Sequence, residues 1–411
     1  MPSLSVLKST AFCLVLVLIS CKGNRQKKEV QAELANLTIT DSVPEIVVGA
    51  NRTSEYLPLV KNKNIGIVAN PTSVVFKNQG YTHLIDSLLA LDLKIKTVFA
   101  PEHGFRGTAD AGELVKDGVD VKTRLPIISL YGKNKKPTPE QLRGLDVLLF
   151  DIQDVGVRFY TYIATLQLVM EACAENNIPL IVLDRPNPNG HYIDGPTMQW
   201  KHTSFLGMAP IPLVYGMTIG EYAQMLNGEN WMKTKRNTDL TIIPIENYTH
   251  STPYSLPIRP SPNLPNDVSI TLYPSLGLFE GTSVNAGRGT AFQFQRYGAS
   301  FLDSTRYGLR YTPKPNFGSK YPKEMGKTCY GRDLSSASRM NSVSLEWILD
   351  AYQNSRDRSN FFKTDAFTKH VGTTALQKQI EEGLSESDIK AIWTADLEKF
   401  KEVRLKYLLY D

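Results

Sequence analysis

The clearest chemical signal in the sequence is a glutamate, a histidine and an arginine that directly follow an apolar stretch. The run reads Val98-Phe-Ala-Pro-Glu-His-Gly-Phe-Arg-Gly107. It predicts a short buried strand that a proline ends, followed by turns at two glycines. Open α/β sheets bind their ligands at the C-terminal ends of strands, so Glu102 is a candidate catalytic acid and His103 and Arg106 are candidate substrate ligands. A polar turn in which the glutamate and the arginine only pair with each other is the alternative.

A second cluster of polar residues follows the apolar run at 147–150. Here Asp151 and Asp154 are three residues apart, and Arg158 and Tyr160 come just after them. The two carboxylates could bind a metal, orient the arginine or cap the next helix. Because soft ligands are missing and the histidines are scattered, orientation and capping are favoured and no metal is expected. All four residues are candidates for the site.

Three further stretches place amides and charged groups in loops. Asn187 follows an apolar run, and Asn263 lies in a proline-rich segment that could also be a simple linker. Glu280, Asn285 and Arg288 share a glycine-rich loop. A carboxylate, an amide and a guanidinium together suit a sugar or a carboxylate ligand. The loop lacks the Lys-Ser/Thr pair of a P-loop, which argues against phosphate binding.

These loops require a scaffold in which several strands end at one edge. From residue 64 on, short apolar runs alternate with helical patterns, which is typical of a parallel sheet covered by helices on both faces. The predicted strands span 65–69, 95–100, 126–130, 147–150, 180–183 and 240–245, and the predicted helices span 83–91, 139–145, 162–176 and 217–226. The fold class is therefore α/β, with a Rossmann-like, mostly parallel sheet. No strand leads into Gly-x-Gly-x-x-Gly, and no cofactor is expected.

The alternation of strands and helices fades beyond residue 250, which suggests a second domain. We predict a Rossmann-like catalytic domain at 45–255 and a smaller α+β auxiliary domain at 256–411. The second domain contains a helical apolar stripe at 272–280 and closes with a helix at about 394–409. The 46 basic and 41 acidic residues give a formal charge of +5 without a long basic run, so no nucleic-acid partner is expected.

The N-terminus has the pattern of a bacterial lipoprotein. Lys8 precedes an apolar run that is too short to span a bilayer, and this run leads into Leu18-Ile-Ser-Cys21. Residues 1–20 are therefore predicted to be a signal peptide, Cys21 the acylated residue and residues 21–44 a flexible tether. The acyl chains would anchor the protein in a membrane, and we expect it to face the periplasm from the outer membrane. A secretory signal with an incidental cysteine is the alternative.

Together the motifs resemble the NamZ-like exo-β-N-acetylmuramidases, from about residue 45 to the end of the chain. The motifs are Pro101-Glu-His-Gly-Phe-Arg-Gly107, Asp151-Ile-Gln-Asp-Val-Gly-Val-Arg-Phe-Tyr160, Asp184-Arg-Pro-Asn-Pro-Asn-Gly190, Arg259-Pro-Ser-Pro-Asn-Leu-Pro265, Tyr273-Pro-Ser, Glu280-Gly-Thr and Arg404-Leu-Lys-Tyr-Leu-Leu-Tyr410. The resemblance implies a Rossmann-like catalytic domain, a smaller C-terminal domain and a cleft between them. It also implies that the protein removes N-acetylmuramic acid from the non-reducing end of peptidoglycan fragments.

The implied chemistry needs two groups with different roles. One protonated carboxyl assists departure of the leaving oxygen, and a second group meets the oxocarbenium-like centre or activates water. Glu102 is the expected acid. Glu280, Asp151, Asp154 and Tyr160 are the candidates for the second role, and the sequence does not rank them.

Selection of N-acetylmuramic acid would depend on its lactyl group, which carries a carboxylate. Arg106, Arg158 and Arg288 are candidates to bind it, because the planar guanidinium can hold a carboxylate through two hydrogen bonds. Each of these arginines lies on a glycine-flanked loop.

Two other functional classes stay open at this point. One is a hydrolase of another peptidoglycan bond, for which the sequence offers no Gly-x-Ser-x-Gly nucleophile elbow. The other is a lipoprotein that only binds cell-wall sugar. Such a protein would keep the amides and arginines and could dispense with Glu102.

The lipoprotein prediction can be tested on Cys21. The wild-type protein should fractionate with membranes and carry the mass of acyl chains, whereas Cys21→Ser should lose both properties. Fractionation and intact-protein mass spectrometry measure the two. A Cys21→Ser protein that stays in the membrane fraction with its mass otherwise unchanged would show that the anchor lies elsewhere.

Overall fold

The computed structural model describes residues 44–106 and 117–411 of the 411-residue chain. The predicted signal peptide, most of the predicted tether, Cys21 and Gly107 lie outside these residues. Contacts group residues 46–411 into one unit. No helix in the part of the chain that the structure describes has both the length and the apolar character that a membrane crossing needs.

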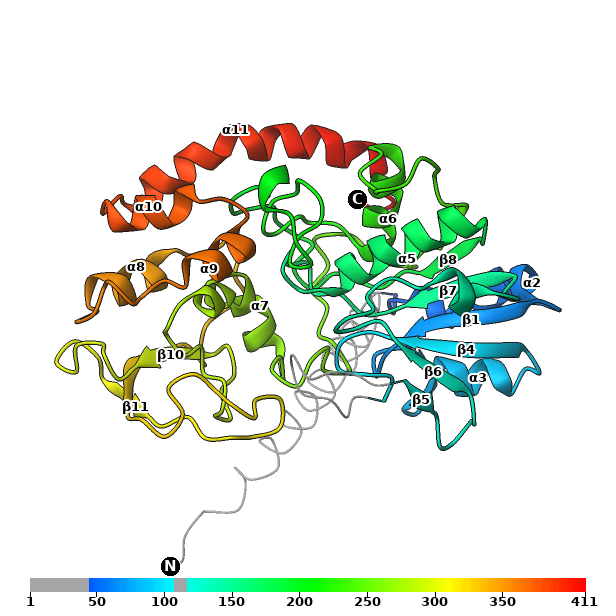
Figure 1. Cartoon of the computed structure of the whole chain (residues 1–411), viewed down its shortest axis with the longest axis horizontal. Helices are drawn as coiled ribbons and strands as arrows, with labels where there is room; N and C mark the ends of the chain where they lie inside the picture. Colours follow the sequence, from blue (N-terminus) through cyan, green and yellow to red (C-terminus); the bar gives the residue numbers. More distant parts are fainter. Residues whose placement is uncertain (1–43, 107–116) are drawn as a thin grey trace, which may run out of the picture. The chain divides into compact units, whose positions relative to one another are not determined.

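A seven-stranded sheet forms the frame of the N-terminal part (Figure 1). Its strand order is β5-β6-β4-β1-β7-β8-β9, and every neighbouring pair is parallel except the edge pair β5-β6. The strands are β1 (Asn64–Ala69), β4 (Lys94–Ala100), β5 (Gly118–Val119), β6 (Pro126–Ser129), β7 (Val147–Asp151), β8 (Leu180–Leu183) and β9 (Leu240–Ile243). The predicted mostly parallel α/β sheet is confirmed.

Helices cover both faces of this sheet, as the apolar character of its strands predicts. Alternate residues of a strand belong to different cores: Phe150 packs in one with α5 and α6, and Leu149 in the other with α2 and α3. The elements around the sheet are η1 (Gly49–Asn51), α2 (Thr53–Val60), α3 (Leu84–Leu89), α4 (Pro139–Leu142), α5 (Tyr162–Asn176), η2 (Trp200–His202) and α6 (Ile219–Gly228). The bounds of α5 match the prediction. The other three predicted helices are wrong by up to three residues at an end: α3 begins after its N-cap His83 and ends at Leu89, α4 ends at Leu142, and α6 runs from Ile219 to Gly228.

A short antiparallel hairpin, β2 (Val74–Phe76) and β3 (Tyr81–His83), was not expected. It lies between β1 and α3, where each strand has only three residues, too few for an alternating pattern to be recognised.

The C-terminal part combines a three-stranded antiparallel sheet with helices. Its elements are α7 (Asp267–Leu276), η3 (Gly277–Gly281), β10 (Arg296–Ala299), β11 (Leu309–Tyr311), β12 (Cys329–Asp333), α8 (Glu346–Gln353), α9 (Thr364–Val371), α10 (Ala375–Glu381), α11 (Glu386–Arg404) and η4 (Leu405–Tyr407). Apolar residues of α7, α8 and α9 belong to the same core as those of α5 and α6. The two parts of the chain therefore share buried surface.

Two predicted helices of the C-terminal part also have different bounds in the structure. The helix expected at 272–280 begins earlier, at Asp267, because Asn266 forms a capping box, and it gives way to a 3-10 helix after Leu276. The helix expected at about 394–409 begins at Glu386, where Ser385 accepts a hydrogen bond from a backbone N–H of the first turn. Both predicted starts were wrong because an apolar stripe alone does not mark the N-terminal cap.

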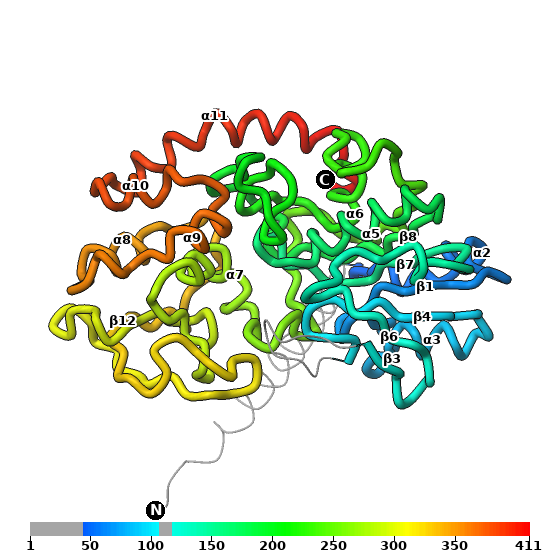
Figure 2. Tube along the Cα trace, viewed as in Figure 1, coloured from blue at the N-terminus to red at the C-terminus, as the bar shows by residue number. Residues whose placement is uncertain are grey.

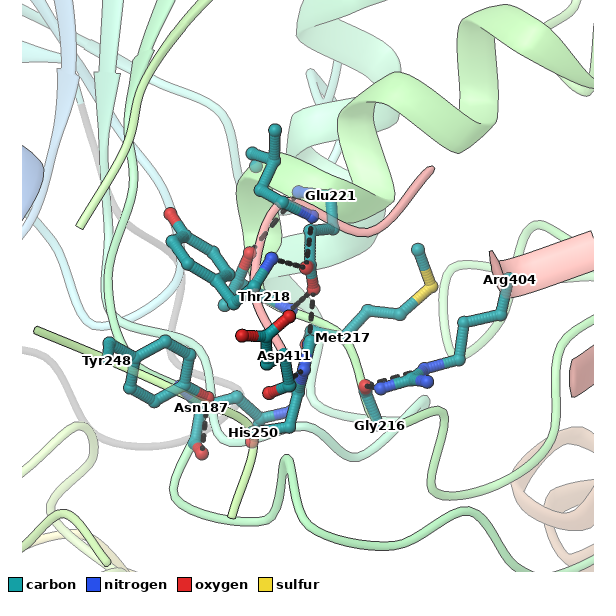
Figure 3. Close-up of polar contacts among 12 residues, drawn as sticks. Asn187, Gly216, Met217, Thr218, Glu221, Tyr248, His250, Arg404 and Asp411 are labelled. Atoms are coloured by element: carbon teal, nitrogen blue, oxygen red, sulfur yellow. Dashed lines mark hydrogen bonds and ion pairs between the residues drawn. The ribbon is translucent and has the colours of Figure 1, made fainter. Parts of the chain in front are cut away.

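The end of the chain returns to the N-terminus of α6 (Figures 1 and 2). Figure 3 shows the buried Glu221 carboxylate at the centre of this contact. It accepts hydrogen bonds from the backbone N–H groups of Thr218 (2.9 Å) and Leu409 (2.8 Å), and it pairs with Nε2 of His250 at 2.8 Å. Arg404 donates to the carbonyl of Gly216 at 2.8 Å. These contacts connect the end of α11 to the N-terminal part of the chain, which contains the seven-stranded sheet.

Candidate active site

A cavity of about 270 Å³ is lined by both parts of the chain. Six of the twelve predicted catalytic and substrate-binding residues line it: Glu102, His103, Tyr160, Asn263, Glu280 and Arg288. The other lining residues are Tyr131, Phe159, Thr161, Phe205, Leu206, Ser261, Leu264, Tyr273, Phe294 and His370. The cavity thus contains two carboxylates, one arginine and an aromatic wall, a combination suited to a polar ligand with apolar faces.

Glu102 lies in a tight turn at the end of β4. The N–H of Gly104 donates to the carbonyl of Pro101 at 3.0 Å. His103 has a φ of 70°, which is in the left-handed range, whereas the φ of Glu102 is not in that range. This is the pattern of a type II turn, whose third position favours glycine. The buried His103 is held there at some cost in backbone energy, as is common for functional residues.

Two hydroxyl groups hydrogen-bond to the Glu102 side chain. Thr161 Oγ1 donates to Oε2 at 3.0 Å, and the Tyr131 hydroxyl is a second partner. Burial, and then the Glu102 carboxylate, raise the pKa of Tyr131 well above its ordinary value. Tyr131 therefore keeps its proton and donates it in a hydrogen bond. Strand ends β4 and β6 and the loop after β7 supply these three residues, as the parallel sheet dictates.

The second carboxylate of the cavity, Glu280, lies among positive charges. Arg288 Nη1 is 2.9 Å from Glu280 Oε2. Burial would raise the pKa of Glu280, but Arg288, Lys323 and His370 together outweigh it and hold the pKa below its ordinary value. Lys323 is fixed by donating to two backbone carbonyls, one of them that of Glu280 itself at 2.9 Å. Glu280 is therefore ionised at neutral pH.

Aromatic rings form one wall of the cavity around Tyr273. The ring of Tyr273 makes edge-to-face contacts with Phe159 (5.1 Å between centroids), Tyr160 (6.0 Å) and Phe294 (4.8 Å). Tyr160 donates its hydroxyl to the carbonyl of Pro260 at 2.6 Å, and burial raises its pKa well above 10. Tyr160 is therefore neutral, and its hydroxyl is occupied by this hydrogen bond. Its ring forms part of the wall, and its hydroxyl holds the proline-rich segment in place.

Two predicted site residues lie outside the cavity lining because they are paired elsewhere. The carboxylate of Asp151 is fully buried under the sheet edge, 2.6 Å from Nε of Arg185. Arg106 binds Asp120 at 2.7 Å and Asp86 at 3.5 Å. The first pair is structural, since removing one partner would leave a buried charge alone.

Arg158 is also outside the lining, and the prediction that a neighbouring aspartate orients it is wrong. Its side chain is buried and donates to the backbone carbonyls of Pro196 (2.7 Å), Ile211 (2.7 Å) and His370 (3.0 Å). Burial lowers the pKa of Arg158 to about 9. The residue therefore connects α9 to the segment after β8 and does not face the cavity.

Asp154 is buried beside the cavity wall without lining it. Its Oδ2 accepts hydrogen bonds from the Tyr215 hydroxyl and from the N–H of Gly156 (2.6 Å). Its Oδ1 is buried and has no hydrogen-bond partner among the described residues. Burial raises the pKa of Asp154 to about 6, against the effect of these hydrogen bonds.

Two predicted asparagines make hydrogen bonds with the backbone and do not line the cavity. Asn187 donates to the carbonyl of Met217 at 2.8 Å and accepts from the N–H of Asn189 at 2.8 Å. Asn285 donates to the carbonyl of Arg288 at 3.0 Å. Asn285 thus fixes the loop that carries the cavity's arginine without itself lining the cavity.

Several residues that interact with the two cavity carboxylates were not among the predicted site residues. Tyr131 and Thr161 could have been predicted from the sequence, because Tyr131 directly follows a predicted strand and Thr161 directly follows the motif that ends at Tyr160. Lys323 and His370 could not, because they reach the site from segments far along the chain.

The sequence matches two family models over most of its length. Residues 65–268 match the model described as exo-beta-N-acetylmuramidase NamZ, N-terminal, and residues 271–410 match its C-terminal counterpart. The chain belongs to the NamZ family. It is 38% identical over 395 residues to the peptidoglycan beta-N-acetylmuramidase NamZ of Bacillus subtilis (strain 168), across 90% of this chain and 93% of that protein.

Two solved structures from Bacteroides fragilis NCTC 9343 share the fold of this NamZ family member. Both are of DUF1343 family proteins. One has a TM-score of 0.82 and 44% identity and covers 90% of this chain and 99% of its own. The other has a TM-score of 0.76 and 28% identity and covers 90% of this chain and 100% of its own.

The surroundings of Asp154 predict an unusual pH dependence of stability. The Asp154 carboxyl releases its proton near the ordinary pKa of 3.8 in the unfolded chain and near 6 in the folded protein. Between these values the folded state binds more protons, so its stability falls as the pH rises. Relative to Asp154→Asn, which cannot titrate, the wild type should lose about 3 kcal/mol of unfolding free energy between about pH 3 and pH 7.

Chemical denaturation of both proteins across this pH range measures the difference. Asn can keep the acceptor that faces Tyr215 and Gly156, so the variant should fold. A difference that does not change with pH would mean that burial does not raise the pKa of Asp154 above its value in the unfolded chain.

Proposed function

We propose that this protein is an exo-acting glycoside hydrolase that releases N-acetylmuramic acid from the non-reducing end of peptidoglycan fragments. Membership of the NamZ family supports the class of reaction. The observation that carries the proposal is that Glu102 and Glu280 line one cavity in different surroundings. Two carboxyl groups with separate roles are what glycoside hydrolysis requires.

Glu102 is the proposed general acid. Glu280 is held ionised by its cationic neighbours and so has no proton to give at neutral pH. Among the described lining residues this leaves Glu102 as the carboxyl group that can protonate the leaving oxygen. The hydroxyls of Tyr131 and Thr161 hydrogen-bond to its side chain and so fix the orientation of the carboxyl group in the cavity.

Glu280 is the proposed second group. Its negative charge can stabilise the positive charge that develops at the anomeric carbon, or activate the group that attacks it. Asp151 and Asp154 do not line the cavity, and Tyr160 is neutral with its hydroxyl bound to a carbonyl. Of the four candidates for this role, Glu280 alone has both the position and the charge.

Arg288 is the proposed ligand of the lactyl carboxylate. It is the one of the three candidate arginines that lines the cavity. Glu280 binds its Nη1, while its Nε is buried and has no partner among the described residues. A carboxylate of the substrate could complete the coordination of the guanidinium, as Arg favours bidentate anions.

We also propose that the mature protein is a lipoprotein, anchored through Cys21 and facing the periplasm from the outer membrane. The pattern Leu18-Ile-Ser-Cys21 after a short apolar run supports this location. A substrate released from the cell wall would then meet the enzyme in the compartment where the wall lies.

Replacing the acid should abolish turnover without unfolding the protein. Glu102→Gln keeps the shape of the side chain but removes the titratable proton, and general acid catalysis typically contributes about 10² to 10⁴-fold to the rate. We expect kcat on a chromogenic N-acetylmuramide to fall by a factor in this range, with the melting temperature nearly unchanged. A folded Glu102→Gln enzyme with near-normal kcat would remove Glu102 from the mechanism.

Arg288→Met should lower the activity on the two sugars of peptidoglycan to different extents. Loss of one partner of a buried charge pair costs about 2 to 5 kcal/mol, so kcat/KM for the muramide should fall at least about thirtyfold. Any activity on the corresponding glucosaminide, which lacks the lactyl group, should fall much less. The same loss on both substrates would show that Arg288 acts only through Glu280 or the fold.

A further inference from the structure

The carbonyl of Gly318 receives hydrogen bonds from two side chains of the cavity. Asn263 Nδ2 donates to it at 2.7 Å and Arg288 Nη2 at 3.3 Å. Gly318 lies in a turn closed by two hydrogen bonds between the backbones of Asn316 and Ser319 (3.1 and 3.0 Å). Its φ of 93° is a conformation that glycine adopts without strain. The turn thus presents one fixed acceptor that aligns both side chains.

This shared carbonyl fixes which way the Asn263 amide points. A carbonyl oxygen can only accept, so the amide nitrogen must face Gly318 and the amide oxygen must face away from it. Asn263 is 4% exposed and lines the cavity, and its Oδ1 has no partner among the described residues. A buried acceptor without a donor is costly, so its usual explanation is a ligand or a water.

Arg288 shows the complementary feature. Its Nη1 binds Glu280 and its Nη2 binds Gly318, which leaves the buried Nε without a partner in the same described set. Among the described residues, the cavity side chains therefore include an unpaired acceptor and an unpaired donor, both on side chains that donate to the Gly318 carbonyl. A ligand that fits them carries a donor and an acceptor on neighbouring substituents of its skeleton.

N-acetylmuramic acid has that arrangement. Its acetamido N–H is on the ring carbon next to the one that bears the lactyl ether, whose carboxylate is an acceptor. Leu264, which follows Asn263 in the chain and lines the cavity, offers an apolar surface for the acetyl methyl group. When Arg288 binds the lactyl carboxylate, the N–H of the acetamido group is left to donate to the neighbouring acceptor, Oδ1 of Asn263.

We infer that Asn263 determines specificity for the 2-acetamido group by accepting a hydrogen bond from its N–H. This inference rests on the proposed function, because it takes the muramic ring as the ligand. The substrate class that the site selects is thereby narrowed to sugars with an N–H donor at this carbon. Asn263 binds and orients the ring and takes no part in proton transfer.

Replacing the acetamido group by an acetoxy group isolates the N–H. Two chromogenic muramides, with 2-acetamido and 2-acetoxy groups, differ only in that N–H becoming an ester oxygen, which cannot donate and would face the Asn263 oxygen. The wild type should prefer the acetamide at least about tenfold in kcat/KM. Asn263→Leu should bring this ratio close to one by lowering activity on the acetamide alone.

Gln167→Leu is the matched control. Gln167 also donates its amide to a backbone carbonyl, that of Trp231 at 3.3 Å, and its Oε1 is also buried without a partner among the described residues, but it does not line the cavity. Gln167→Leu should keep the wild-type ratio whatever it does to stability. If Asn263→Leu lowers activity on both substrates by one factor, or if the wild type itself shows no preference, the inference is overturned.

A binding measurement separates this inference from the proposed function. Calorimetry with N-acetylmuramic acid and its 2-O-acetyl analogue does not depend on turnover. A wild type that binds the amide at least about tenfold more tightly, but hydrolyses neither chromogenic substrate, would contradict the proposed hydrolysis and still support the role of Asn263. Equal affinities of the two sugars would overturn that role even in an active muramidase.

Discussion

The ion pair between Glu280 and Arg288 determines the charge of the cavity, and the rest of the site depends on it. It keeps Glu280 ionised, and in the proposed mechanism this charge is what gives the two carboxyl groups of the cavity different roles. It also leaves Nη2 of Arg288 to donate to the Gly318 carbonyl and Nε buried without a partner among the described residues. Lys323 and Asn285 donate to the backbone carbonyls of Glu280 and Arg288 and so hold the two loops of this pair in place.

A parallel sheet supplies the opposite side of the cavity. Because β4 and β6 end at the same edge, Glu102 and Tyr131 meet there although they are distant in the sequence. The C-terminal part has no such constraint and is positioned by the apolar core that it shares with α5 and α6. The chain end, bound to Glu221 at the start of α6, adds a polar tie between the same parts.

Much of the fold followed from the sequence, because strands buried on both faces and capped helices leave strong local patterns. The site was harder to predict, since a polar residue after a strand can turn under the sheet as well as into the cavity. Asp151 does the first, and its partner Arg185 lies in another motif, so the pairing had no local signature. His370 enters from the end of α9, where only the tertiary fold brings it near Glu280.

The proposed function requires that this cavity takes N-acetylmuramic acid from a chain end. The most direct test uses two peptidoglycan fragments of equal length, one ending at its non-reducing end in N-acetylmuramic acid and the other in N-acetylglucosamine. Mass spectrometry of the products should show free N-acetylmuramic acid and a fragment one sugar shorter from the first, and no cleavage of the second. Cleavage inside both fragments, or release of the terminal sugar from both alike, would contradict the proposed function.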